Sequence, residues 1–277
     1  MTFALIQTLT RQPYIKKERW RDLKSLLDEA YTRYHRASFI ENDPISIPSL
    51  FSTKQDREIA GFLAATLAWG QRKTILKSAH RLLSCMDSRP YEFVLHASKA
   101  DLKLLQTFVH RTFQGEDAVY FIQALRFIYQ NYASMEDVFT EGIRPSSPNL
   151  AEGILHFREK FFTLPHALRT RKHVPDIARN AAAKRLNMFL RWMVRKDAID
   201  FGLWKSISPA QLLCPLDVHT GRVARSLGLL ERKQDDWKAV LELTESLKKL
   251  DPHDPIKYDI ALFSLGVDTE KHASRLL

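Results

Sequence analysis

Apolar residues recur every three or four positions along most of the 277-residue chain, which is the spacing of one helix face. The stretch from residue 16 to residue 34, for example, places Trp20, Leu23, Leu27 and Tyr34 on one such face. The same spacing predicts further helices over residues 51–67, 73–85, 101–113, 118–132, 150–162, 180–195, 218–227, 235–250 and 256–265. No convincing run alternates polar and apolar residues as a strand does. The pattern therefore predicts an all-α protein.

Glycine and proline mark the breaks between these helices. Gly70 follows the helix that ends at Leu67, where a left-handed glycine is a common terminator. Pro165 and Pro175 interrupt the pattern between residues 163 and 180, which predicts a basic, exposed loop or hairpin. Because no Gly/Ser-rich or Pro-rich linker divides the chain, we expect one domain over residues 1–277. Within it we expect an N-terminal helical extension, a first helical lobe and a lobe with the hairpin, over residues 1–50, about 51–145 and about 146–277.

The positive charge of the chain is concentrated in one segment. The formal net charge is +10, with a pI near 9.6. Eleven basic residues and only two acidic ones lie between Arg158 and Lys196, so this segment carries almost the whole excess. Such a run is either a solvated face or a surface that binds phosphates, and the sequence leaves both open.

Composition also bears on the compartment. The two cysteines, Cys85 and Cys214, are too few for a disulfide scaffold and lack the close pairing of zinc or iron–sulfur sites. The first residues show no basic segment ahead of a long apolar run, and no stretch approaches membrane-spanning length. We expect a monomeric cytoplasmic protein with no membrane partner and no metal.

Two candidate reactive groups follow the basic loop. The helix predicted over residues 180–195 has an apolar face that carries Leu186, Phe189, Leu190 and Met193. Its polar face carries Lys184, Asn187, Met188, Arg191 and Arg195. Asp217 stands at the N-cap position of the next helix, which Gly228 closes. From residue type alone, Lys184 is an ordinary solvated lysine and Asp217 an ordinary cap.

The segment around Asp217 resembles a known enzyme superfamily. Its sequence, L-D-V-H-T-G-R-V over residues 216–223, is similar to the V-D-T-H-V-x-R-V segment of helix-hairpin-helix DNA glycosylases of the endonuclease III type. The resemblance continues at L-G-L over residues 227–229 and at L-F-S-L-G over residues 262–266. It implies a two-lobed helical fold with a cleft between the lobes, an essential aspartate at Asp217 and, in bifunctional members, a lysine that forms a Schiff base with the sugar.

A second resemblance covers more of the chain. The segment R-W-M-V-R over residues 191–195, together with residues 216–223, looks very much like a bacterial family known as domain of unknown function 2400. That similarity extends over most of the chain and implies no established activity.

The departures from the glycosylase pattern concern the hairpin. Residues 174–181, V-P-D-I-A-R-N-A, are a degenerate counterpart of the glycosylase hairpin L-P-G-V-G-R-K-T-A and lack both glycines. In that register Asn180 takes the place of the lysine. The archaeal 8-oxoguanine glycosylases instead have a lysine about thirty residues before their aspartate, and Lys184 precedes Asp217 by 33 positions. We favour Lys184. The cluster-ligating cysteines of endonuclease III are absent, so no cofactor is expected.

The resemblance implies a DNA-binding base-excision repair enzyme, a DNA glycosylase with abasic-site lyase activity. Asp217 would stabilise the positive charge of the oxocarbenium-like transition state, and Lys184 would attack C1′ of the sugar. Further residues would contact damaged or abasic duplex DNA, by stacking, by filling the gap left by the extruded base or by binding phosphates. They are Trp69, Gln71, Arg72, Arg111, Arg179, Asn180, Arg185, Arg191, Arg195, Trp204, His219 and Arg222.

Two alternatives belong to other functional classes. His219, His253-Asp254 and Asp259 are residue types that a metal-dependent histidine-aspartate phosphohydrolase uses, although Asp254 before Pro255 also has the pattern of a helix cap. The second alternative is a non-catalytic nucleic-acid-binding protein that keeps the glycosylase scaffold, because a fold does not determine a function. The target base is not readable from the sequence.

Overall fold

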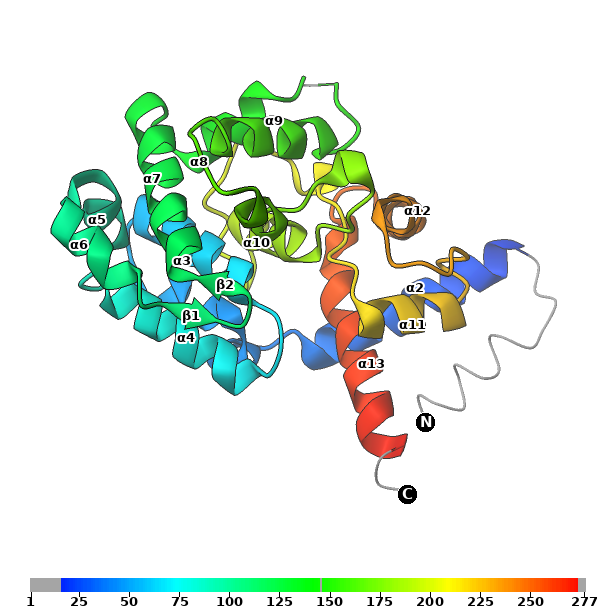
Figure 1. The fold of residues 1–277 in the computed structure, drawn as a ribbon. Helices are drawn as coiled ribbons and strands as arrows, with labels where there is room; N and C mark the ends of the chain where they lie inside the picture. Colours follow the sequence, from blue (N-terminus) through cyan, green and yellow to red (C-terminus); the bar gives the residue numbers. More distant parts are fainter. Residues whose placement is uncertain (1–15, 145, 274–277) are drawn as a thin grey trace.

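The computed structural model describes residues 16–144 and 146–273 as an assembly of helices with one small hairpin (Figure 1). The α-helices are α2 (Lys16–Tyr34), α3 (Lys54–Leu67), α4 (Arg72–Ser84), α5 (Pro90–His96), α6 (Lys99–Leu105), α7 (Gly115–Asn131), α8 (Met135–Glu141), α9 (Ala151–Phe161), α10 (Lys184–Val194), α11 (Val218–Ser226), α12 (Trp237–Lys248) and α13 (Tyr258–Ala273). The strands β1 (Val109–His110) and β2 (Phe113–Gln114) pair antiparallel. The all-α prediction is confirmed. Residues 1–15, 145 and 274–277, which the predicted domain boundaries include, lie outside the described residues.

Side-chain caps explain where several helices begin. Thr53 accepts a hydrogen bond from the Asp56 amide at the start of α3, and Ser98 forms a capping box with Asp101 at α6. Ser134 does the same at α8. Each cap satisfies amides that have no partner inside the helix, which stabilises a helix start by about 1 kcal/mol.

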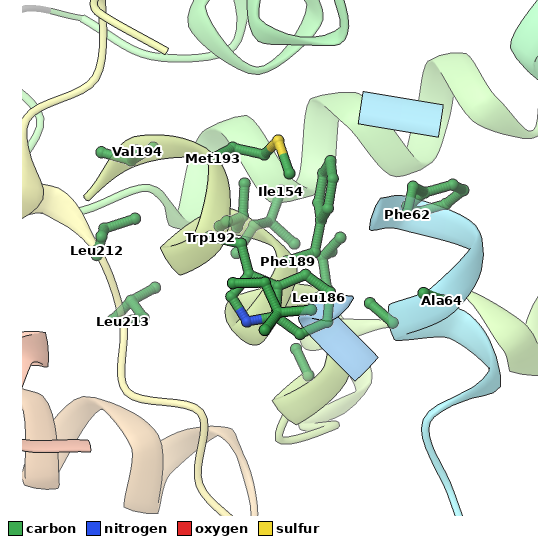
Figure 2. Close-up of a cluster of buried hydrophobic side chains, with 14 of the residues drawn as sticks. Phe62, Ala64, Ile154, Leu186, Phe189, Trp192, Met193, Val194, Leu212 and Leu213 are labelled. Atoms are coloured by element: carbon green, nitrogen blue, oxygen red, sulfur yellow. The ribbon is translucent and has the colours of Figure 1, made fainter. Parts of the chain in front are cut away.

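The centre of the core lies where α10 packs against α3. Figure 2 shows Leu186, Phe189 and Met193 of α10 beside Phe62 of α3. The Phe62 ring lies 5.7 Å from Phe189 and contacts three further phenylalanine rings from α7 and α9. All ten residues from Glu58 to Leu67 are buried, so α3 forms the middle of the molecule and fixes the position of α10.

A buried carboxylate ties this core together. Glu58 is fully buried, and it accepts hydrogen bonds from the Tyr129 and Ser134 hydroxyls, the Met135 amide and the Trp204 indole. Burial raises the pKa of Glu58 against the effect of these donors. Because the donors come from separate segments, the carboxylate holds α3, α7 and α8 in register.

The first and last described helices pack together beside α11 (Figure 1). The Tyr258 hydroxyl of α13 donates to Asp28 of α2 over 2.8 Å, and the Tyr34 hydroxyl of α2 donates to Asp268 of α13. Arg19 of α2 donates to the Leu227 carbonyl at the end of α11. These contacts hold α11, which carries Asp217 at its start, in place.

The structure corrects several predicted elements. The helix predicted over residues 101–113 is wrong, because α6 ends at Leu105 and a hairpin follows. A Cβ atom on Gly115 would lie 2.1 Å from the Gln106 carbonyl oxygen, so only glycine allows α7 to begin there. The helices α5 and α8 were not predicted. The segment 163–180 contains two 3-10 helices. Four of its residues, Thr170, His173, Val174 and Ile177, are buried, so the expectation of an exposed loop is wrong for this part of the segment.

None of the described helices combines the length and the apolar character needed to span a membrane.

Candidate functional site

The candidate site begins at the first residue of α10. Two non-glycine residues just before the helix, Asn180 and Ala183, adopt left-handed backbone conformations with φ of 65° and 52°. The helix predicted from residue 180 therefore starts only at Lys184, with Ala183 as an N-cap that offers no side-chain hydrogen bond. Left-handed alanine is strained by about 1–2 kcal/mol, and the packing around this turn maintains it.

Asn180 and Lys184, the two candidates for the lysine position, point to different places. The Asn180 amide donates to Asp236 Oδ2 over 2.8 Å, and its backbone oxygen accepts from the Trp237 amide. Asn180 thus links the turn to the start of α12. Lys184 lies on the other side of the turn, in the wall of a cavity.

Lys184 and Asp217 meet in this cavity wall. The Nζ atom of Lys184 lies 3.1 Å from Asp217 Oδ2, with the side chains 36% and 14% exposed. The other carboxylate oxygen of Asp217 accepts from the Thr220 amide over 2.9 Å and caps α11. Asp217 therefore caps α11 and pairs with Lys184 at the same time, so a role in capping does not exclude the expected role in the reaction.

The cavity has a volume of about 510 Å³, within the range of small-molecule sites. Its walls come from the α3–α4 connection, the start of α10, the start of α11 and the first half of α13. Charged side chains in the wall are Asp43, Arg72, Lys184, Arg185, Arg191, Asp217 and Asp259. Apolar ones include Trp69, Ile75, Met188, Ile260 and Phe263. An apolar cavity with a few convergent charged groups is typical of a binding site.

Two buried carboxylates face the same cavity. Asp259 is paired with Arg191 at 2.5 Å, and burial, together with the negative charge of Asp217, raises the pKa of Asp259 to about 6 against the opposing effect of Arg191. Burial also raises the pKa of Asp43, which accepts the Ile45 amide and lies 4.0 Å from Arg72. Both groups are perturbed by burial plus specific partners, which is a common property of functional carboxylates.

Trp69 and Arg185 form a stack in the cavity wall. The Arg185 guanidinium lies 4.7 Å from the centre of the Trp69 ring, and its Nη1 donates to the Thr66 carbonyl. Trp69 also contacts the rings of His110 and His173. The expectation that Trp69 itself stacks on a nucleobase therefore stays a prediction with a competing structural role, since the indole already supports an arginine.

Three predicted DNA contacts are buried, and we correct them here. Trp204 is 1% exposed, and its indole N–H donates to Glu58, so it cannot stack on a base. Arg191 is 4% exposed between Asp200 and Asp259. Arg195 is 2% exposed. Trp204 and Arg195 lie outside the cavity lining, and Arg191, which contributes to the wall, is held between two carboxylates, so each already has a partner other than a DNA phosphate.

Carboxylates surround Arg195 in particular. Its guanidinium donates to Asp200 over 2.6 Å and to Asp254 over 2.7 Å, and Asp197 lies 2.7 Å away. Burial works against the charged form, but these carboxylates raise the pKa of Arg195 above its usual value. The Asp254 side chain makes no cap hydrogen bond, which corrects its interpretation as a cap.

The remaining predicted contacts are accessible. Gln71 and Arg72 are exposed after Gly70, and Arg72 also lies 5.6 Å from the Phe263 ring. Arg111 is exposed at the hairpin turn with φ of 54°, and it lies so close to Gly70 that a Cβ there would come within 2.5 Å of its Nη1. Gly70 itself has φ of 102°, a conformation that glycine adopts without strain and other residues rarely adopt.

Arg179 and Arg222 are exposed, and His219 lines the cavity. The His219 ring packs edge-on against Phe263 at 5.7 Å, and its Nδ1 lies 3.3 Å from Arg222 Nη2. The structure thus brings several predicted site residues to one cavity: Trp69, Arg72, Lys184, Arg185, Arg191, Asp217 and His219. The others lie outside its lining: Gln71, Arg111, Arg179, Asn180, Arg195, Trp204 and Arg222.

The chain matches the family model described as "Protein of unknown function (DUF2400)" over residues 43–268. It belongs to this family. No curated protein and no solved structure matches the chain. The DUF2400 match begins at Asp43 and runs past Asp259, so the family region contains every charged residue of the cavity wall.

The sequence does not indicate that two buried carboxylates, Asp43 and Asp259, line the same cavity as Lys184 and Asp217. Asp43 has the pattern of an ordinary turn before Pro44, and Asp259 was considered only as a metal ligand. One signal was available for Asp259, because it is the only charged residue in the apolar run from Tyr258 to Leu265. A lone acid in such a run is buried and needs a partner.

Proposed function

We propose that the protein is a DNA glycosylase with abasic-site lyase activity and that Lys184 and Asp217 carry the chemistry. The observation that carries the proposal is the 3.1 Å approach of the Lys184 amine to the Asp217 carboxylate in the wall of a cavity of about 510 Å³. A nucleobase fits a cavity of this size. The resemblance around residues 216–223 and the spacing of the two residues add support.

The charge and placement of Asp217 suit the first step. Breaking the glycosidic bond leaves its electron pair on the base and a positive charge on the sugar. A carboxylate in a half-buried wall stabilises that charge more strongly than one in water, since the local dielectric is lower. The hydrogen bond from Thr220 keeps the carboxylate oriented before substrate arrives.

Lys184 suits the second step. Its ammonium must lose one proton before the nitrogen attacks C1′, and Asp217 at 3.1 Å is placed to accept it. The new C1′–N bond then becomes a Schiff base as the sugar ring opens. Loss of a C2′ proton and departure of the 3′ phosphate complete β-elimination and cleave the strand.

The approach of DNA would follow the exposed cations around the cavity. Arg72 lines the cavity, Arg111 lies beside Gly70 of the cavity wall, and Lys172 and Arg179 lie on the segment before α10. Phosphate contacts of this kind position a duplex without reading its sequence. They are compatible with a degenerate helix-hairpin-helix between residues 174 and 184, and with a cleft between two lobes.

Borohydride trapping tests the lyase step directly. Duplexes that carry an abasic site or a single damaged base are incubated with wild-type protein and borohydride, which reduces a Schiff base to a stable adduct. We expect a covalent adduct from wild type and none from Lys184→Ala. Lys103→Ala, which removes an exposed lysine on α6 outside the cavity lining, is the matched control and should still give the adduct.

Two other outcomes would point elsewhere. An undiminished adduct in Lys184→Ala would remove Lys184 from the chemistry. Duplex binding without adduct or base release would favour the non-catalytic nucleic-acid-binding protein.

The phosphohydrolase alternative has less support, because Asp254 and Asp259 are held by arginines. In addition, no group of three or more metal-ligating side chains gathers anywhere in residues 16–144 and 146–273.

A further inference from the structure

Arg185 differs from the other arginines of α10 in what surrounds it. Arg191 and Arg195 are each paired with at least two carboxylates. Arg185 has the Thr66 carbonyl as its hydrogen-bond acceptor and the Trp69 ring beneath it. Across residues 16–144 and 146–273 no carboxylate pairs with its guanidinium, and no further acceptor is found for its Nε or Nη2.

This arrangement is costly in the absence of a ligand. Burial lowers the pKa of Arg185 to about 10, so the side chain remains a cation at neutral pH. A largely buried cation without a counter-charge is unfavourable, because its desolvation is not offset by an ion pair. Replacing Arg185 by a neutral side chain would remove this desolvation cost. The chain supplies acids to Arg191 and Arg195 nearby and none to Arg185. The free donors of Arg185 belong to a side chain in the cavity wall, where a ligand can reach them.

The chemistry of the wall restricts what that ligand is. A guanidinium offers a flat face and several N–H donors, so it binds planar groups that carry acceptor oxygens. Trp69 holds the guanidinium in one orientation from below, which reduces the entropy lost on binding. Each carboxylate of the wall has a cation beside it: Asp43 lies near Arg72, Asp217 near Lys184 and Asp259 near Arg191. Among the described residues of the wall, the charge of Arg185 is left without a counter-charge, so a ligand with its own positive charge would be repelled.

We propose that Arg185 binds the base in this cavity through the base's carbonyl oxygens and thereby selects neutral, carbonyl-rich bases against cationic, N-alkylated ones. The proposal rests on the proposed function in taking the ligand to be a nucleobase. Trp69 is the positioning residue for Arg185, and Arg185 touches the base.

Equilibrium binding to two matched duplexes tests this selection. One duplex carries a single 8-oxoguanine, which is neutral and has an additional carbonyl, and the other carries a single N7-methylguanine, which is cationic. The target sugar in both carries a 2′-fluorine, which disfavours positive charge at C1′, so that the base is not released during the measurement. Dissociation constants are measured by fluorescence anisotropy at one salt concentration with the full chain.

We expect wild type to prefer the oxidised duplex by at least about tenfold, since charge-assisted hydrogen bonds contribute this much or more. Arg185→Met should reduce the preference to less than about threefold, and Arg185→Lys should keep part of it. Trp69→Leu should also reduce it while leaving every charge in place. Arg89→Met, a substitution of a surface arginine on a different helix, should leave it unchanged.

Equal binding of the two duplexes by wild type, including binding to neither, overturns the proposal. So does an undiminished preference in an Arg185→Met protein that melts at the wild-type temperature. If Arg185→Met fails to fold, the Trp69→Leu ratio decides. Base release from the unfluorinated duplexes is followed in parallel. If wild type prefers the oxidised duplex but releases no base, the glycosylase function is contradicted and the role of Arg185 is not. If it releases the base but binds both duplexes equally, the role of Arg185 is contradicted and the glycosylase function is not.

Discussion

The two carboxylate oxygens of Asp217 have separate partners, which lets one substitution distinguish their effects. Oδ1 accepts the Thr220 amide, and Oδ2 faces Lys184. Asparagine caps a helix about as well as aspartate but carries no charge. The half-exposed ion pair contributes at most about 1 kcal/mol to folding.

Asp217→Asn should therefore lower the free energy of unfolding by less than about 1 kcal/mol and slow base release by about 10²-fold or more. Urea denaturation and single-turnover base release measure the two quantities. Asp236→Asn is the matched control, because Asp236 caps α12 in the same way and lies outside the cavity lining. Equal base release by Asp217→Asn and wild type would exclude Asp217 from the reaction.

Asp259 gives the protein a pH dependence whose sign follows from its raised pKa. The folded-state pKa is about 6 and the ordinary value is 3.8, so between these values the folded state binds more protons than the unfolded state. Stability contributed by this group is present at low pH and is lost as pH rises through 6.

We expect wild type to be more stable relative to Asp259→Asn, with a larger free energy of unfolding, at pH 4.5 than at pH 7.5. Chemical denaturation of both proteins at the two pH values measures the difference. Asp235→Asn, which removes an acid from a surface pair with Arg225, should show no comparable change between the two pH values. A relative stability that rises with pH would mean that Arg191 dominates the environment of Asp259.

At the scale of elements, the turn before α10 determines which residue faces the cavity. Left-handed residues at 180 and 183 direct Asn180 to α12 and Lys184 to Asp217. A lysine substituted at position 180 would extend toward the start of α12. The two hydrogen bonds that the Asn180 side chain makes there would be lost.

The double variant Asn180→Lys/Lys184→Ala should therefore form no borohydride adduct, although it keeps a lysine in the hairpin register of the glycosylase pattern. Adduct formation is measured as for Lys184→Ala. The single variant Asn180→Lys serves as control and should retain the adduct through Lys184. Restored trapping in the double variant would show that position 180 reaches the reacting sugar.

The sequence predicted most long helices well and the short ones poorly, for a physical reason; the exception is α13, which continues past its predicted end at residue 265 to Ala273. Amphipathic spacing over more than ten residues identified α2, α3 and α7 within a few positions. Seven-residue helices such as α5 and α8 contain too few turns for that spacing to be visible. Their starts are set by Pro90 and by the Ser134 cap.

The same limit applies to the site. Asp217 and Lys184 could be found because a motif and a spacing along the chain mark them. Whether an arginine binds DNA or a buried acid depends on partners from distant segments, as Arg191 and Asp259 show. Periodicity placed Arg191 on a polar face, but this face is covered by α13 and the segment after α10.

At the scale of the whole molecule, buried ion pairs leave the net charge of +10 unchanged but reduce the number of basic residues that a polyanion can reach. Arg191 and Arg195 belong to the basic segment, but they are neutralised inside the protein. The cations left for a polyanion are exposed ones such as Arg72, Arg111 and Arg179. The segment over residues 158–196 therefore offers fewer accessible cations than its eleven basic residues suggest.

If about five phosphates are contacted, duplex affinity should fall roughly 10²–10³-fold between 50 and 200 mM salt. Anisotropy titrations at several salt concentrations give the slope. Arg179→Ala should make the slope shallower by about one contact, and Arg89→Ala should not change it. A slope near zero would argue against phosphate binding by this protein.

The pairing of α2 with α13 has a consequence for biosynthesis. Asp28 and Tyr258 are 230 residues apart, so at ribosomal rates roughly 10–50 s separate the synthesis of the two helices. During this interval Leu23, Leu26 and Leu27 of α2, which are buried in the finished protein, have no α13 to cover them. The nascent chain therefore carries an exposed apolar stripe, which is a natural substrate for a chaperone until the last helix leaves the ribosome.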